Sequence, residues 1–187
     1  TGVHGVPRRS VARVFQDNAV DPAFDPGEGP DADVTLLAVQ PDGRLLIAGD
    51  FTNVAGKPRT GLARLSSTGA LDETFDAGPG PAWLVTGSRD GAAKVLTLGV
   101  QPDGRVLVGG RFTHFSHEPA LCLTRLEPDG RPDRTLHSPF VPGSGETSGV
   151  WPPPVGISSV VRTLVLQPDG RIIAGGLVSF TMQGLPI

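Results

Sequence analysis

Two histidines, His114 and His117, stand three positions apart, a spacing that would let two imidazoles reach one metal ion. Imidazole is a common zinc ligand, but a zinc site also needs further ligands to complete its coordination. We find no local third ligand at a suitable spacing. The competing interpretation is a pair of solvent-exposed histidines, and the sequence predicts no metal and no other cofactor.

Both tryptophans fall in long connections between apolar segments, and one of these connections also carries a neighbouring arginine and aspartate. Aromatic and arginine side chains on extended loops often dominate the energy of protein interfaces. The sequence therefore predicts a binding rim, and the alternative is that each tryptophan folds back to fill its own loop. The predicted rim residues are Trp83, Arg89, Asp90, His114, His117 and Trp151.

Cys122 is the single cysteine, so the chain can form no intramolecular disulfide and holds no set of thiolates for structural zinc. It lies in an apolar run, which favours a small buried hydrophobic residue. A reactive thiol would need a nearby base, and the adjacent sequence supplies none.

One connection is rich in carboxylates, which raises the question of a calcium site. Its sequence matches no defined calcium loop, and the equivalent links of the other repeats lack these acids. We interpret the carboxylates as solvated turn residues. They are Asp25, Glu28, Asp31 and Asp33.

Composition excludes several classes of function. The net charge is −3 and no block of Lys or Arg occurs, so the basic surface of a nucleic-acid binder is missing. The longest apolar runs are near five residues, far below the roughly 20 that a spanning helix needs, so we expect no membrane insertion. The N-terminus has no charged segment followed by an apolar stretch, so we expect that a secretory signal is absent or was removed before this chain begins. Nucleophile-elbow, phosphate-loop and zinc-hydrolase motifs are also lacking, so the sequence predicts no catalytic residues and no enzyme.

The dominant signal is an internal repeat. Gln-Pro-Asp-Gly-Arg occurs at 40–44, 101–105 and 167–171, each time followed by an apolar run that ends in glycine. Asp-Gly between two apolar runs is a strong cue for a β-hairpin. A second signature places an arginine eight residues before an aspartate, and we interpret the two as hydrogen-bonded within one repeat. These pairs are Arg13 with Asp21, Arg64 with Asp72, and Arg125 with Asp133.

The repeat predicts an all-β fold. Residues 34–39 and 45–48 form the expected hairpin, 62–65 a third strand and 71–75 a short fourth strand, while no long window has helical periodicity. Four short antiparallel strands in about 50 residues are typical of a β-propeller blade. We treat residues 1–187 as one propeller segment of about three repeats. The repeat phases run roughly over 1–50, 51–111 and 112–178, with 179–187 entering the next loop.

The ordered motifs resemble the delta-60 repeat, a family of bacterial β-propeller repeats of unknown function. The order is Gln-Pro-Asp-Gly-Arg, apolar run, Gly-Gly-x-Phe-Thr, Pro-Arg, Ala-Arg-Leu, turn and Leu-Asp-x-x-Phe. Leu177-Val178-Ser179 and Ala120 depart from this pattern. Such repeats are common in surface or secreted proteins, so the resemblance implies an extracellular or cell-surface setting in a bacterium.

A closed propeller needs roughly four to eight blades, so three repeats imply further blades of the same protein or other protein chains as partners. The leading functional interpretation is a non-catalytic scaffold for protein–protein interaction or assembly. A carbohydrate-binding propeller is the alternative, although the absence of tyrosine counts against it. The third functional interpretation is a hydrolase or lyase with carboxylates around a central channel.

Overall fold

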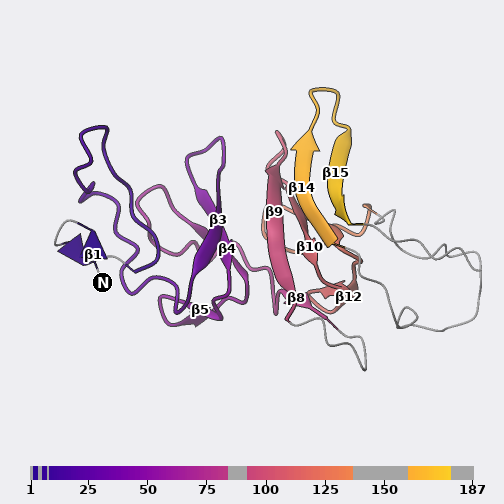
Figure 1. Ribbon diagram of the computed structural model, residues 1–187, viewed down its shortest axis with the longest axis horizontal. Coiled ribbons are helices and arrows are strands. Elements are labelled where there is room, and N and C mark those ends of the chain that lie inside the picture. The colour runs from indigo at the N-terminus through magenta and orange to yellow at the C-terminus, as the bar shows by residue number, and fades with distance from the viewer. Residues whose placement is uncertain (1, 4–5, 8, 84–91, 137–159, 178–187) are drawn as a thin grey trace, which may run out of the picture.

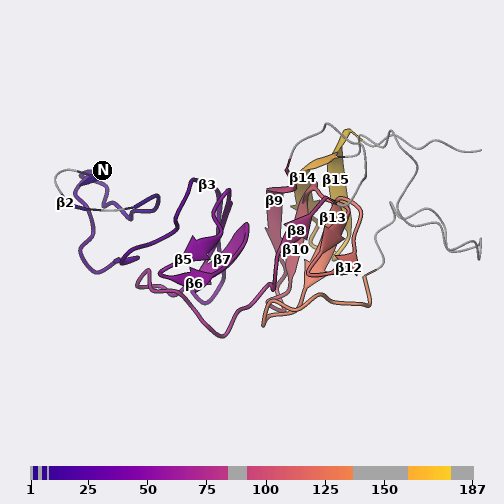
Figure 2. The same ribbon diagram turned by 90° about the horizontal axis from the view of Figure 1, so that it is seen from below.

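The fold is a row of antiparallel β-sheets that stand side by side along the long axis of the molecule (Figure 1). The computed structural model describes residues 2–3, 6–7, 9–83, 92–136 and 160–177. Within these ranges all regular structure is β-strand. Figure 2, seen from below, keeps the same order of sheets along the row. The predicted all-β fold, with tandem propeller blades, is confirmed.

A search of the described residues for a helix long and apolar enough to span a bilayer found none.

The first blade that the structure describes in full contains β3 (Val34–Val39), β4 (Leu45–Gly49) and β7 (Leu62–Leu65), in the order β3-β4-β7. Its hairpin bends at the predicted turn, where the Gln40 amide donates to the Arg44 carbonyl at 2.8 Å. Gly43 adopts a φ of +82°, which explains the glycine at this position.

The next blade repeats this order with β9 (Lys94–Val100), β10 (Val106–Arg111) and β13 (Leu123–Leu126). The third repeat is described as a hairpin of β14 (Val160–Leu166) and β15 (Ile172–Leu177). All three Pro-Asp-Gly segments therefore lie at the bends of paired strands.

The predicted fourth strand is reduced to one bridge in each blade, Leu65 to Leu71 and Leu126 to Pro132. Directly after the first of these bridges the Asp72 carboxylate accepts a hydrogen bond from the Thr74 amide at 3.0 Å. A side chain that caps its own backbone in this way turns the chain, which ends the strand.

Short hairpins fill the connections on one rim. Before them, β1 (Gly2–Val3) pairs with β2 (Val6–Pro7) near the N-terminus. Both rim hairpins turn through consecutive residues of positive φ, as in tight two-residue turns. Their strands are β5 (Asn53–Val54) with β6 (Lys57–Pro58), and β8 (Pro81–Ala82) with β11 (His114–Phe115) and β12 (Glu118–Pro119).

The main hydrophobic core lies between neighbouring blades. One buried cluster joins Leu46 and Leu62 of the first blade to Val95 and Val108 of the second, with Phe75 of the link between them. Apolar side chains of both sheets meet in this cluster, so each sheet covers one face of its neighbour. Burial between sheets thus holds the row together.

Gly130 is a point where two blades approach each other closely through their backbones. Its φ is +95°, and an added Cβ would lie 2.7 Å from a backbone atom of Asp76. Gly104 has a similar φ of +85° but no atom nearer than 3.6 Å. We expect both alanine variants to lose about 1–2 kcal/mol from the positive φ. Gly130→Ala should lose about 1–3 kcal/mol more from the clash.

Urea unfolding curves of the two variants measure this difference. Equal losses for Gly130→Ala and Gly104→Ala would show that the contact between the blades adds nothing to stability.

Candidate functional site

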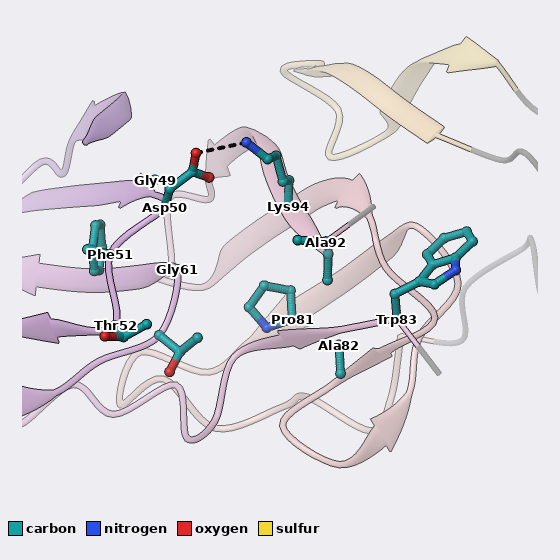
Figure 3. Close-up of a pocket in the computed structure, with 12 residues that line it drawn as sticks. Gly49, Asp50, Phe51, Thr52, Gly61, Pro81, Ala82, Trp83, Ala92 and Lys94 are labelled. Carbon is teal, nitrogen blue, oxygen red and sulfur yellow. Dashed lines mark hydrogen bonds and ion pairs between the residues drawn. The ribbon is translucent and has the colours of Figure 1, made fainter. Parts of the chain in front are cut away.

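An open cavity of about 500 Å³ lies on the rim between the first and second described blades. Phe51, Pro81 and Ala82 give it an apolar lining. Figure 3 shows Asp50 and Lys94 meeting along one edge, with Phe51 and Trp83 at opposite ends of the group. The cavity thus combines an apolar surface with an ion pair and one large aromatic side chain.

Close backbone contacts position the strand that carries Pro81 and Ala82. Gly80 has a φ of +73°, and a Cβ there would lie 2.1 Å from the Thr60 carbonyl oxygen. Gly61, with a φ of +70°, would meet the Pro81 ring at 3.2 Å. Because only glycine fits both places without displacement, β8 lies directly against the first blade.

Asp50 and Lys94 form an ion pair of 2.8 Å between consecutive blades. Both side chains are largely exposed, so the pair adds little to stability. Its effect is to place two opposite charges at the edge of the cavity. Sequence analysis missed both residues, although one signal was available. In an antiparallel meander, the chain leaves the second strand of one blade on the same rim where it enters the first strand of the next blade. Asp50 and Lys94 occupy these two positions.

Trp83 is the predicted rim residue that lines the cavity. Its side chain is half-buried, and its indole nitrogen is covered yet has no hydrogen-bond acceptor among the residues that the structure describes. A buried N–H without an acceptor costs about 1–3 kcal/mol of desolvation, so such groups are rare in native proteins.

The two histidines have different environments. His114 lies on β11, is buried, and has its Nδ1 3.0 Å from the Thr113 hydroxyl. Burial lowers the pKa of His114 below its ordinary value, which favours the neutral imidazole. His117 is exposed at the turn with a φ of +69°. The interpretation of both as solvent-exposed is wrong for His114, which is buried on the central strand of the β12-β11-β8 sheet.

His114 is nevertheless part of the same rim, since it pairs with Ala82 in the β8–β11 ladder. Among the residues described, no three His, Cys, Asp or Glu side chains are grouped so that they could hold a metal ion. Arg89, Asp90 and Trp151 lie outside the described residues.

The arginine–aspartate signature forms the predicted hydrogen bond in each repeat. The Nε to Oδ2 distances are 2.7, 2.8 and 2.6 Å for the pairs beginning with Arg13, Arg64 and Arg125. The structure adds a second bond that the sequence did not predict. Nη1 of Arg13 donates to the Ser67 carbonyl, and Nη1 of Arg64 donates to the Pro128 carbonyl. These two arginines therefore also link one blade to the next.

Asp31 of the acid-rich connection is engaged in local structure. Its carboxylate accepts hydrogen bonds from the amide and side-chain groups of Thr52 and Asn53 at 2.8–3.1 Å. The bond from Asn53, followed by those from Thr52, lowers the pKa of Asp31 far below its ordinary value. The carboxylate thus fastens the start of β5 to the link before the first blade.

Cys122 is fully buried, as the sequence predicted. Burial raises the pKa of its thiol to about 11. The thiol is therefore protonated at neutral pH, which suits a structural residue.

A comparison with protein families matched two segments, residues 40–75 and 101–136, to a domain of unknown function described as a beta-propeller, DUF5122. No curated protein and no solved structure gave a significant match. Each matched segment begins at a Gln-Pro-Asp-Gly-Arg turn and ends three residues after the aspartate of the arginine–aspartate signature. In these two segments the chain is similar to a β-propeller repeat family of unknown function.

Proposed function

We propose that this propeller segment is a non-catalytic scaffold that binds another protein through the cavity beside Trp83. The observation that carries the proposal is the open cavity, in which Phe51, Pro81 and Ala82 lie beside the large aromatic side chain of Trp83. Tryptophan is among the residues most enriched in the energetic centres of protein interfaces.

The lining supports a peptide more than a reacting substrate. Asp50 and Lys94 supply its charges, and each already neutralises the other. Phe51, Pro81 and Ala82 offer apolar contact for a side chain. An apolar surface with a few polar groups at its edge is the usual composition of a recognition site.

We further propose that the repeats are of the delta-60 type and that the protein works at the bacterial cell surface or outside the cell. The support is the ordered set of motifs between Gln40 and Phe75 and its return after Gln101. The family match at these segments agrees with the coarser description of a propeller repeat.

A peptide library tests the binding site. We expect selection of phage-displayed 12-residue peptides on the immobilised chain to yield ligands that depend on Trp83. Trp83→Ala should weaken them about 30-fold, the effect of losing an interface residue worth about 2 kcal/mol. Trp83→Phe keeps one aromatic ring but loses part of the contact area of the indole, so it should weaken them less, about fivefold for a loss of about 1 kcal/mol.

Phe15→Ala is the matched control, because Phe15 is an exposed aromatic residue in the segment before the first complete blade. It should leave peptide binding unchanged. Peptides that bind Trp83→Ala as well as the unchanged chain would refute the site. Saturable, Trp83-dependent binding to a glycan array would support the carbohydrate-binding alternative instead.

A further inference from the structure

The two joints between consecutive blades differ at one equivalent place. The first joint lies between the two described blades of three strands, and the second lies between the later of these blades and the β14–β15 hairpin. Counted from the Gln-Pro-Asp-Gly-Arg motif, Thr60 and Gly61 of the earlier blade correspond to Leu121 and Cys122 of the later one. Gly61 and Cys122 share a positive φ, +70° and +60°, and their amides donate to phenylalanine carbonyls at 2.9 and 3.0 Å. The backbones agree, so the side chains make the difference.

The chain fills the second joint with its own apolar side chains. Leu121 is 3% exposed and Cys122 is fully buried. Both belong to one hydrophobic cluster with Val161 of β14, and Leu164 packs against this cluster. An aliphatic side chain at position 121 therefore occupies the space between these two sheets.

The first joint has a similar apolar wall but smaller residues opposite it. Val95 and Leu98, the β9 equivalents of the two β14 residues, pack in the core between the blades. Thr60 and Gly61 line the open cavity. Gly61 lies beside the Pro81 ring, where an added Cβ would come within 3.2 Å of it (Figure 3). Because threonine and glycine are smaller than leucine and cysteine, the first joint keeps an open space where the second is packed.

The chemistry of the lining favours an aliphatic side chain over a charged one. Ala82 and Ala93 offer methyl groups, and the Thr52 hydroxyl already donates to a carboxylate at 2.8 Å. Asp50 and Lys94 neutralise each other at the edge. A charged side chain would lose its water there without gaining a free opposite charge, whereas burial of an apolar side chain is favourable.

We propose that the cavity binds a leucine-sized aliphatic side chain of a peptide partner, in the place that Leu121 occupies in the second joint. The inference rests on the proposed peptide-binding function and names the residue that the peptide must supply. The residue at this position decides whether a joint is open to a partner. Thr60 leaves room for the side chain of a peptide, and Leu121 fills the equivalent space itself.

An alanine scan of the selected peptides identifies the anchoring residue. We expect each Trp83-dependent peptide to contain one leucine, isoleucine or methionine whose replacement by alanine weakens binding at least about tenfold, because several methylene groups leave the cavity. Norleucine at this place should restore binding to within about threefold, since the volume is conserved. Peptides anchored by an aromatic or a charged residue would overturn the inference.

Filling the cavity from within the chain tests the same place. Thr60→Leu copies the residue of the second joint, and we expect it to weaken the peptides at least about tenfold. Ala82→Leu, on β8, should have the same effect. Thr35→Leu is the matched control and should leave binding unchanged, because Thr35 is exposed on β3 and is not among the lining residues. Urea unfolding checks that each variant is folded. Peptides that bind both filled variants as tightly as the unchanged chain would refute the anchor site.

A small probe tests the cavity without any peptide. N-acetyl-leucine methylamide should bind the unchanged chain with a dissociation constant on the order of millimolar and shift the amide NMR signals of Gly61 and Ala82. The aspartate analogue should bind at least about tenfold more weakly. Equal binding of the two probes would overturn the inference. Binding of the leucine probe, together with a library that yields no Trp83-dependent peptide, would support the anchor site and refute the proposed peptide-binding function.

Discussion

Replacing Asp72 with alanine is expected to lower the free energy of unfolding by about 3–5 kcal/mol, the usual cost of removing one partner of a buried ion pair. The Arg64 side chain is only 5% exposed and bonds Asp72 at 2.8 Å. Its guanidinium also lies 4.8 Å from the centre of the Phe75 ring. Without Asp72, a buried positive charge loses its main partner. Urea unfolding followed by circular dichroism measures the loss.

Asp21→Ala is the matched control, because it breaks the same signature at the first repeat. Arg13 is 43% exposed, so water can replace the lost carboxylate and the effect should be much smaller. Similar losses for Asp21→Ala and Asp72→Ala would show that burial of the pair is not what makes it stabilising.

The pH dependence of stability gives a second readout of the same variant. Burial tends to raise the pKa of Asp72, but hydrogen bonds from Thr74 and Arg64 outweigh it and hold the pKa below 3.8. For Asp133 the same balance lowers the pKa to about 2. Protonation therefore favours the unfolded chain, and this stability is lost as the pH falls from about 4 towards 2. Asp72→Ala should show a shallower acid decline, and an unchanged slope would contradict the assignment.

Truncating Phe75 to alanine is expected to cost about 3–5 kcal/mol, the usual range for a phenylalanine removed from a core. Phe75 is fully buried in the cluster that joins the first and second described blades. Its removal leaves a cavity there and also removes the ring beneath Arg64. The midpoint of urea unfolding should fall, and amide protons of β4 and β10 should exchange faster.

Phe15→Ala controls for the loss of an aromatic side chain as such. Phe15 is half exposed, so its removal should change the free energy of unfolding by no more than about 0.5 kcal/mol. If Phe75→Ala were no more harmful than Phe15→Ala, the contact between blades could not be the main source of stability in the row.

The hairpins could be predicted from the sequence because their causes are local. Gly43 is required by a positive φ at the bend, and apolar runs of fixed length flank it. The arginine–aspartate pairs were also predictable, since the two residues are eight positions apart in every repeat. The fourth strand was shortened because the Asp72 side chain turns the chain at the first bridge.

The candidate site could be predicted only in part. Trp83 was singled out by its residue type and its loop, and it lines the cavity. The burial of His114 was missed because the β8–β11 ladder pairs it with Ala82, 32 positions earlier. The ion pair of Asp50 with Lys94 spans 44 positions and depends on how two sheets face each other.

By itself the sequence determined the repeat, the bends and the all-β character of the chain, because turn chemistry and apolar patterning act over a few residues. Only the tertiary structure decided which repeats share a core, where the cavity opens, and that Arg64 binds the carbonyl of Pro128, 64 residues away. Such contacts depend on how whole sheets pack against each other. The spacing of residues along the sequence does not give the distance between two sheets.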